Sequence, residues 1–190
     1  MYPTANHNWT TPILSAVAIL LATVVVSPLQ KITTSPTLPQ RQTTIAATTI
    51  APLQSQKDAV LTTTPATLTL SVSQEKTILL NIASPKNKVT GSEIHLKFNP
   101  EVISIKEISA GDFLANPLRL AKQIDNQKGE VVYTIGTLKP SAGSGILANV
   151  IINAKGTGAT QLSLDGTIVT AENQNENTVK SLQGATITVQ

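Results

Sequence analysis

From residue 66 to the C-terminus, the chain is a succession of short segments in which apolar and polar residues alternate. Examples are TLTLSV, SEIHLKF, EVVYTIG and GATITVQ, and Gly, Pro, Asn or Asp residues separate most of them. A period of two, β-branched residues and frequent turn residues predict β-strands. No stretch keeps the 3.6-residue period of an amphipathic helix. We therefore predict an all-β fold for residues 66–190, a two-sheet antiparallel β-sandwich of about nine strands.

The residues before this region divide into an apolar segment and a polar linker. Residues 12–29 carry no charged side chain. This suits a signal peptide or a short membrane span, and the poor cleavage site favours an uncleaved anchor, a hydrophobic helix within residues 1–29. Lys31 and Arg41 follow the segment, and the positive-inside tendency would place the residues after it in the cytoplasm. This argues against an export signal that carries the rest of the chain out of the cell.

Residues 30–65 are rich in Thr, Pro and Gln and show no sustained period, which predicts a disordered stalk. We expect a membrane-anchored domain outside the cell, or a secreted one if the leader is cleaved.

The alternation also predicts which side chains face the core. In the strands expected over residues 92–98, 118–125 and 130–136, one face is mostly apolar and the other mostly polar. The predicted inward positions are Ile94, Leu96, Phe98, Leu118, Leu120, Ile124, Val131, Tyr133 and Ile135.

A polar corner at residues 99–101 separates two of the expected strands within LKFNPEVISIKEISAGDFL. The Asn99 side chain can bond to nearby backbone, and Pro100 presets φ for the turn. With Phe98 anchored in the core, the corner lets the chain cross from one sheet to the other. It is a structural feature and requires no reactive group.

The sequence offers no convincing catalytic set. The absence of cysteine excludes a disulfide framework, a thiolate metal site and a cysteine nucleophile. His95 is the one histidine of the domain and lies on a polar strand face, and no convincing Ser-His-Asp set can be assembled. The acidic residues are scattered singly on turns and outward faces, so nothing selects a catalytic pair of carboxylates. We therefore predict no enzyme activity, no catalytic residue and no cofactor.

Three classes of ligand can be weighed from composition. No basic stripe with interleaved aromatic residues is present, which argues against nucleic acid. The segment ENQNEN at residues 172–177 lacks the pattern of a calcium loop, which favours a solvated hairpin and no metal. A carbohydrate platform needs exposed aromatic rings, and with Phe98 and Tyr133 facing inward only Phe113 is left.

The region from about residue 67 to 189 resembles a cohesin domain, the module that captures dockerin domains in cellulosome-type assemblies. The similar stretches are FNPEVISIKEISAGDFL, GEVVYTIGTL, GSGILANVIINAKGTGATQLSL and the final TIVTAENQNENTVKSLQGATITV. The resemblance implies a jelly-roll sandwich and a non-catalytic binding module. It also implies that calcium belongs to the dockerin-like partner, so that no metal is expected in this chain.

The resemblance further implies that the partner binds one sheet face. The strands that match are those over residues 91–98, 118–125, 129–138 and 167–172. Family members often carry Asn and Asp where this chain has Gly91 and Glu93. The outward residues that match the partner-binding face are Gly91, Glu93, His95, Arg119, Gln123, Thr134, Gly136 and Thr137.

Three hypotheses follow for the function. The first is a non-catalytic cell-surface module that docks a dockerin-like protein in an extracellular, polysaccharide-degrading assembly. The second is a carbohydrate-binding module of the same sandwich group, whose ligand would be a polysaccharide. The third is a structural surface protein with no specific ligand on its face.

Overall fold

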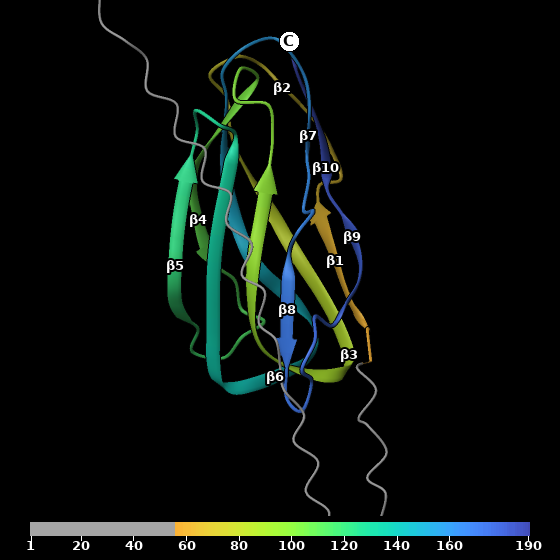
Figure 1. The fold of residues 1–190 in the computed structure, drawn as a ribbon. Coiled ribbons are helices and arrows are strands. Elements are labelled where there is room, and N and C mark those ends of the chain that lie inside the picture. Colours follow the sequence, from red (N-terminus) through yellow and green to blue (C-terminus); the bar gives the residue numbers. More distant parts are fainter. Residues whose placement is uncertain (1–55) are drawn as a thin grey trace, which may run out of the picture. The chain divides into compact units, whose positions relative to one another are not determined.

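The computed structural model describes residues 56–190, which form ten β-strands and no helix (Figure 1). The all-β prediction is confirmed. The apolar segment at residues 12–29 and most of the linker lie outside the described residues. Within residues 56–190, no helix could span a membrane. The strands are β1 (Ala59–Thr64), β2 (Thr67–Leu70), β3 (Glu75–Lys97), β4 (Ile103–Ala110), β5 (Leu118–Asp125), β6 (Glu130–Ala154), β7 (Gly158–Leu162), β8 (Ile168–Ala171), β9 (Val179–Gln183) and β10 (Ala185–Val189).

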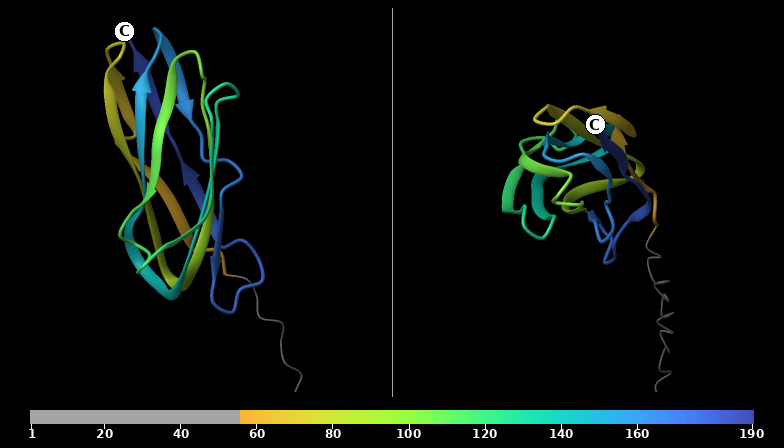
Figure 2. Two further views of the ribbon diagram at one scale, coloured as in Figure 1. Left: turned by 90° about the vertical axis from the view of Figure 1, so that its left-hand side faces the viewer. Right: turned by 90° about the horizontal axis from the view of Figure 1, so that it is seen from above.

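The two longest strands, β3 and β6, organise the sandwich. They pair with each other along most of their length, and both turn back at the lower end of the view in Figure 1. The first half of β3 and the second half of β6 therefore share a layer with β1, β4 and β9, in the order β4-β6-β3-β1-β9. The other halves share a layer with β5 and β8. A separate three-stranded sheet contains β2, β10 and β7 (Figure 2).

The pairing is antiparallel in most of the sandwich, but two strand pairs are parallel. These are β1 with β9 and β2 with β10. The predicted antiparallel pairing therefore does not hold for these two pairs, which join the start of the domain to its end. Parallel partners are far apart in the sequence, and alternation within one strand does not reveal its neighbour.

Aliphatic side chains from both layers fill the core. The inward positions predicted in β3 and β6 are confirmed as buried, and Ile94, Leu96 and Ile135 are at most 1% exposed. Ile124 of β5 packs against the same cluster. Burial in this apolar setting raises the pKa of Tyr133.

The corner after β3 has the predicted structure. The backbone N–H of Glu101 donates to Oδ1 of Asn99 at 2.9 Å, and Phe98 is buried. Gly129 packs against this corner with φ of +74°, and a Cβ there would stand 2.1 Å from the carbonyl oxygen of Phe98. The corner carries the chain from the β5–β8 layer to β4 in the opposite layer.

The sandwich begins earlier than residue 66. Strand β1 lies between β3 and β9, and the side chains of Ala59 and Leu61 are fully buried in the core. The boundary expected at Ala66 is therefore corrected, since residues 59–64 belong to the sandwich. Alternate residues of this strand are buried. Its sequence, AVLTTT, has the same Thr-rich composition as the linker, so the strand could not be distinguished from the linker by composition.

A buried carboxylate fixes the chain just before β1. Asp58 accepts hydrogen bonds from the backbone N–H groups of Lys86 at 2.7 Å and Asn87 at 3.1 Å. The Ser84 hydroxyl and the Asn87 amide donate to its other oxygen. Burial raises the pKa of Asp58, but these four hydrogen bonds outweigh burial and hold the pKa below its ordinary value. Asp58 thus ties β1 to the bend in the middle of β3.

Candidate functional site

The strands that the sequence analysis grouped into one binding face are neighbours, in the order β5-β6-β3-β8. Glu93 of β3 pairs with Thr134 of β6 on one side and with Ile168 of β8 on the other. Residues paired directly across a sheet share a face. We use the term four-strand face for the outward surface of β5, β8, the first half of β6 and the second half of β3.

A polar pair lies on this face. The Nε2 atom of His95 is 2.7 Å from Oε1 of Glu93, and the two side chains are 29% and 42% exposed. The backbone N–H of His95 also donates to the Thr167 hydroxyl at 3.1 Å, which fixes β3 against the turn before β8. The pair can therefore present a carboxylate and an imidazole to a partner from a fixed position.

The orientation predicted for the start of β5 is wrong. Leu118 and Leu120 were expected to face inward, but they are 51% and 68% exposed. The register shifts between Arg119 and Ala121, so the strand holds one extra residue at this point. Such a bulge reverses the alternation. The inward and outward assignments are therefore correct after the bulge and reversed before it.

The same bulge removes Arg119 from the four-strand face. Arg119 pairs with Ile135, whose side chain is buried, so Arg119 lies on the inward side of the edge strand. Nearby, Lys122 donates a hydrogen bond to Glu107 of β4, which closes the side of the sandwich between the two layers. This bond, with a smaller contribution from the charges of Lys122 and Arg119, lowers the pKa of Glu107.

Most of the other predicted residues lie together on the four-strand face. Thr137 is an exception, because it follows Gly136 and its hydroxyl bonds to the Ala115 carbonyl and the Lys139 backbone. The predicted residues that the structure brings together are Gly91, Glu93, His95, Gln123, Thr134 and Gly136.

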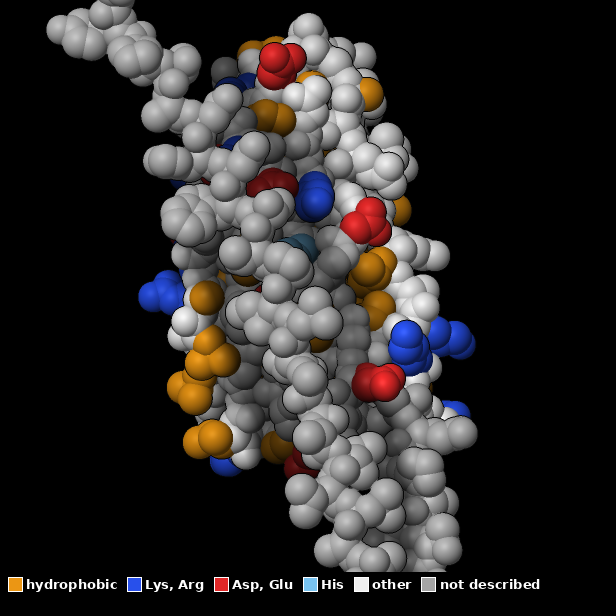
Figure 3. Space-filling view, viewed as in Figure 1, with side chains coloured by type: hydrophobic (Ala, Val, Ile, Leu, Met, Phe, Trp, Pro, Cys, Tyr) orange, Lys and Arg blue, Asp and Glu red, His pale blue; other side chains and the backbone are white. Residues whose placement is uncertain are grey.

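Sequence reasoning missed the apolar part of this surface. Among residues 56–190, all the exposed large hydrophobic side chains except Val72 belong to β5, β6 and β8. Figure 3 shows hydrophobic side chains gathered near the start of β5. Leu118 and Leu120 could not be recognised because the bulge hides their orientation. The residues concerned are Leu118, Leu120, Leu138 and Ile168.

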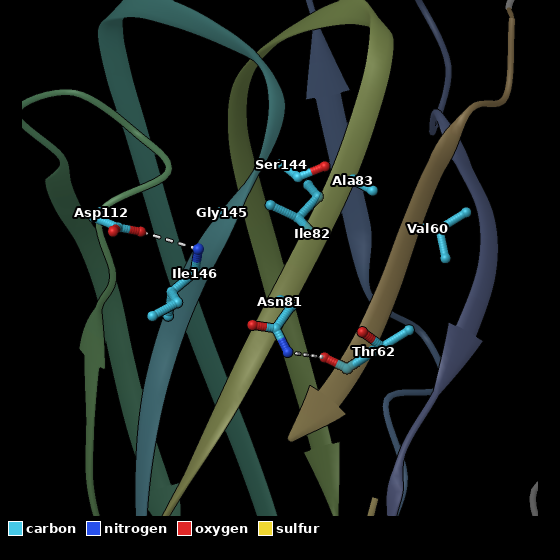
Figure 4. A pocket seen from close by; sticks show the side chains of 9 residues that line it. All are labelled: Val60, Thr62, Asn81, Ile82, Ala83, Asp112, Ser144, Gly145 and Ile146. Carbon is cyan, nitrogen blue, oxygen red and sulfur yellow. Dashed lines mark hydrogen bonds between the residues drawn. The ribbon is translucent and has the colours of Figure 1, made fainter. Parts of the chain in front are cut away.

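A shallow hollow of about 360 Å³ lies on the opposite layer, between β1, β3 and β6 (Figure 4). Two of its polar side chains, Asp112 and Asn81, already form hydrogen bonds. The backbone N–H of Ile146 donates to Asp112 at 3.0 Å, and the Asn81 amide donates to the Thr64 hydroxyl at 2.8 Å. Among the described residues that line the hollow, Asp112 is the one acidic residue and none is a histidine.

The structure also bears on metals and sugars. Phe113, which was expected to be exposed, is 8% exposed and packs in the core. No aromatic ring is therefore exposed within residues 56–190, and the four-strand face has no stacking platform for a sugar. The same residues contain no group of three or more His, Asp or Glu side chains arranged to hold a metal ion.

The comparisons with known proteins agree on one family. The family model of the cohesin domain matches residues 61–189 of the chain. Its start inside β1 agrees with the corrected boundary of the sandwich. Among curated proteins, no significant match was found.

Solved cohesin structures share the fold at low sequence identity. The third ScaC cohesin of Acetivibrio cellulolyticus, solved in complex with the ScaB dockerin, is 11% identical with a TM-score of 0.59, and the match covers 70% of this chain and 99% of that one. A cohesin module from a Clostridium perfringens family 33 glycoside hydrolase is 18% identical (TM-score 0.56, coverage 70% and 98%). A non-cellulosomal cohesin from Archaeoglobus fulgidus is 15% identical (TM-score 0.56, coverage 71% and 91%).

Proposed function

This chain belongs to the cohesin family, and we propose that it is a non-catalytic binding module that docks a dockerin-type protein on its four-strand face. The observation that carries the proposal is the concentration of exposed apolar residues on that face, beside the Glu93–His95 pair. Contiguous exposed apolar surface with a polar surround is typical of protein-binding sites. The A. cellulolyticus cohesin, which shares this fold, was solved bound to a dockerin.

In this proposal the apolar residues supply most of the binding free energy, and the polar residues fix the position of the partner on the face. Leu118 and Leu120 stand beside Gly136, and the Leu120 Cδ1 atom would lie 3.5 Å from a Cβ at that position. A partner that covers these leucines removes them from water, which is favourable in proportion to the area buried. Thr134, Gln123 and Glu93 then offer hydrogen-bonding groups beside the leucines.

The calcium of the complex belongs to the partner in this proposal, as in the family. We further propose that the domain lies outside the cell, held by residues 12–29 and spaced by the linker. The assembly would serve polysaccharide degradation; the C. perfringens module, which comes from a glycoside hydrolase, is an example of a cohesin within an enzyme that cleaves glycosidic bonds. The A. fulgidus cohesin is described as non-cellulosomal, so family membership alone does not define the assembly.

Calorimetric titration with dockerin modules tests the proposal. The full chain, purified in mild detergent, is titrated with each calcium-loaded dockerin module encoded in the genome of its source. We expect at least one to bind in calcium and to lose binding in chelator. Glu93→Ala should weaken that binding about tenfold at an unchanged melting temperature, since the residue is on the face and outside the core.

The matched control is Glu101→Ala, which removes an exposed carboxylate at the corner after β3. Its affinity should equal that of the unmodified chain. Retention on an insoluble polysaccharide with no dockerin bound in calcium would replace the proposal with the carbohydrate-binding hypothesis.

A further inference from the structure

We infer that docking on the four-strand face takes up a proton at the Glu93–His95 pair, so that the partner binds more tightly as the pH falls from 8 to 6. The inference rests on the proposed function and adds a regulation of the same site. Histidine side chains change charge between pH 5 and 8, whereas carboxylates in water stay ionised over this range. The charge of the pair over that range therefore depends on His95.

The geometry couples the two side chains closely. The Nε2 atom of His95 lies 2.7 Å from the Glu93 carboxylate, and it donates a hydrogen bond there whenever Nε2 carries a proton, as in the imidazolium or the Nε2–H tautomer. Protonation of His95 turns this contact into an ion pair of opposite charges, and the pair becomes neutral overall. With neutral His95, the pair carries the full negative charge of Glu93.

The immediate neighbours of the pair are mostly uncharged. Glu93 stands between Thr134 and Ile168, and His95 stands opposite Val132. Ile168 is 39% exposed, so a partner that packs on this region meets apolar surface next to the carboxylate. Docking would then strip water from Glu93, and burying a carboxylate without an opposite charge is costly. Protonated His95 supplies that charge from within the face.

Within residues 56–190, few other charged groups surround His95. On its own strand Lys97 is the next outward residue, and it is paired across the ladder with Glu130 of β6. From the turn before β8, Gly166 approaches the ring so that a Cβ at this position would lie 3.8 Å from the Cβ and Cγ atoms of His95, and the acidic Asp165 precedes it in the chain. The charges of Lys97 and Glu130 offset each other across the ladder, which leaves Glu93 as the carboxylate in contact with the His95 ring.

The test is the pH dependence of binding to the calcium-loaded dockerin modules used above, with calcium in excess. For the unmodified full chain we expect the affinity at pH 6 to exceed that at pH 8 by about tenfold, the ratio that a one-unit difference in proton affinity produces. In His95→Gln the amide can still donate a hydrogen bond to Glu93, but it cannot take up a proton. That variant should show at most the residual pH dependence of the partner itself.

Proton uptake gives a second readout. Titration at pH 7 in two buffers with different ionisation enthalpies should show protons bound on docking by the unmodified chain and none by His95→Gln. The inference would be overturned if the ratio of affinities at pH 6 and pH 8 were the same for the unmodified chain and His95→Gln. It would also be overturned if the unmodified chain alone bound more tightly at pH 8 than at pH 6. Either result would leave the docking proposal intact. Absence of binding at every pH would overturn the docking proposal and the inference together.

Discussion

A fragment that begins at Ala66 is expected to lose cooperative folding, whereas a fragment of residues 56–190 keeps it. The shorter fragment lacks β1, which lies between β3 and β9 and pairs with both. It also loses the fully buried Leu61 side chain, worth about 2 kcal/mol. A domain of this size is stable by only about 5–15 kcal/mol, so loss of an internal strand should be decisive.

Urea unfolding followed by far-UV circular dichroism distinguishes the two fragments. Residues 56–190 should give one sigmoidal transition, and residues 66–190 should give a gradual change or aggregate. A sharp transition of the shorter fragment with an unfolding free energy close to that of the longer one would show that β1 is dispensable. The corrected boundary would then be wrong.

Replacement of Asp58 by Asn is expected to destabilise the domain by about 3 kcal/mol at pH 7. The Asn side chain keeps one acceptor oxygen, but its NH₂ group faces donors that, in the unmodified chain, bond to the second carboxylate oxygen. Those donors include the Lys86 and Asn87 backbone N–H groups, which sit 2.7 and 3.1 Å from Oδ2. Since the network holds the start of β1 to β3, its loss should loosen the same region that the shorter fragment lacks.

The destabilisation caused by Asp58→Asn should depend on pH in one direction. The pKa of Asp58 is lower in the folded state than its ordinary value of 3.8. Its contribution is therefore complete above about pH 4 and is lost as the pH falls through the folded-state pKa. The difference in unfolding free energy between the unmodified chain and Asp58→Asn should shrink from pH 7 to pH 2.

The control for this experiment is Asp165→Asn, at an exposed turn position, which should change the unfolding free energy by less than about 0.5 kcal/mol. A constant difference between the unmodified chain and Asp58→Asn at all pH values would show that the Asp58 carboxylate is not the titrating group.

The sequence was sufficient to predict strands wherever alternation is regular. The second half of β3 and the first half of β6 have the predicted faces because every alternate residue there is buried against the opposite layer. The corner at Asn99 and Pro100 was also predictable, since its turn chemistry is local. Long-range pairing was not predictable, because the parallel partners of β1 and β2 come from the far end of the chain.

The candidate site was predicted in part. The resemblance to cohesins indicated the correct group of neighbouring strands, and Glu93, His95 and Thr134 share the face. The bulge in β5 is a single extra residue with no Gly or Pro to mark it, and it exchanged the positions of Arg119 and the two leucines. The most apolar part of the surface was consequently assigned to the core.

The central claim is that the partner docks on the four-strand face, and single cysteines test it most directly because the chain has none of its own. Gln123→Cys places a thiol on β5 within the face, and Gln161→Cys places one on β7 in the three-stranded sheet, both at exposed positions. The rate of alkylation is measured with and without a calcium-loaded dockerin that binds the full chain. We predict that the partner slows alkylation at position 123 at least tenfold and leaves position 161 unchanged. Unchanged alkylation at position 123 with bound partner, or protection at position 161 alone, would contradict the account.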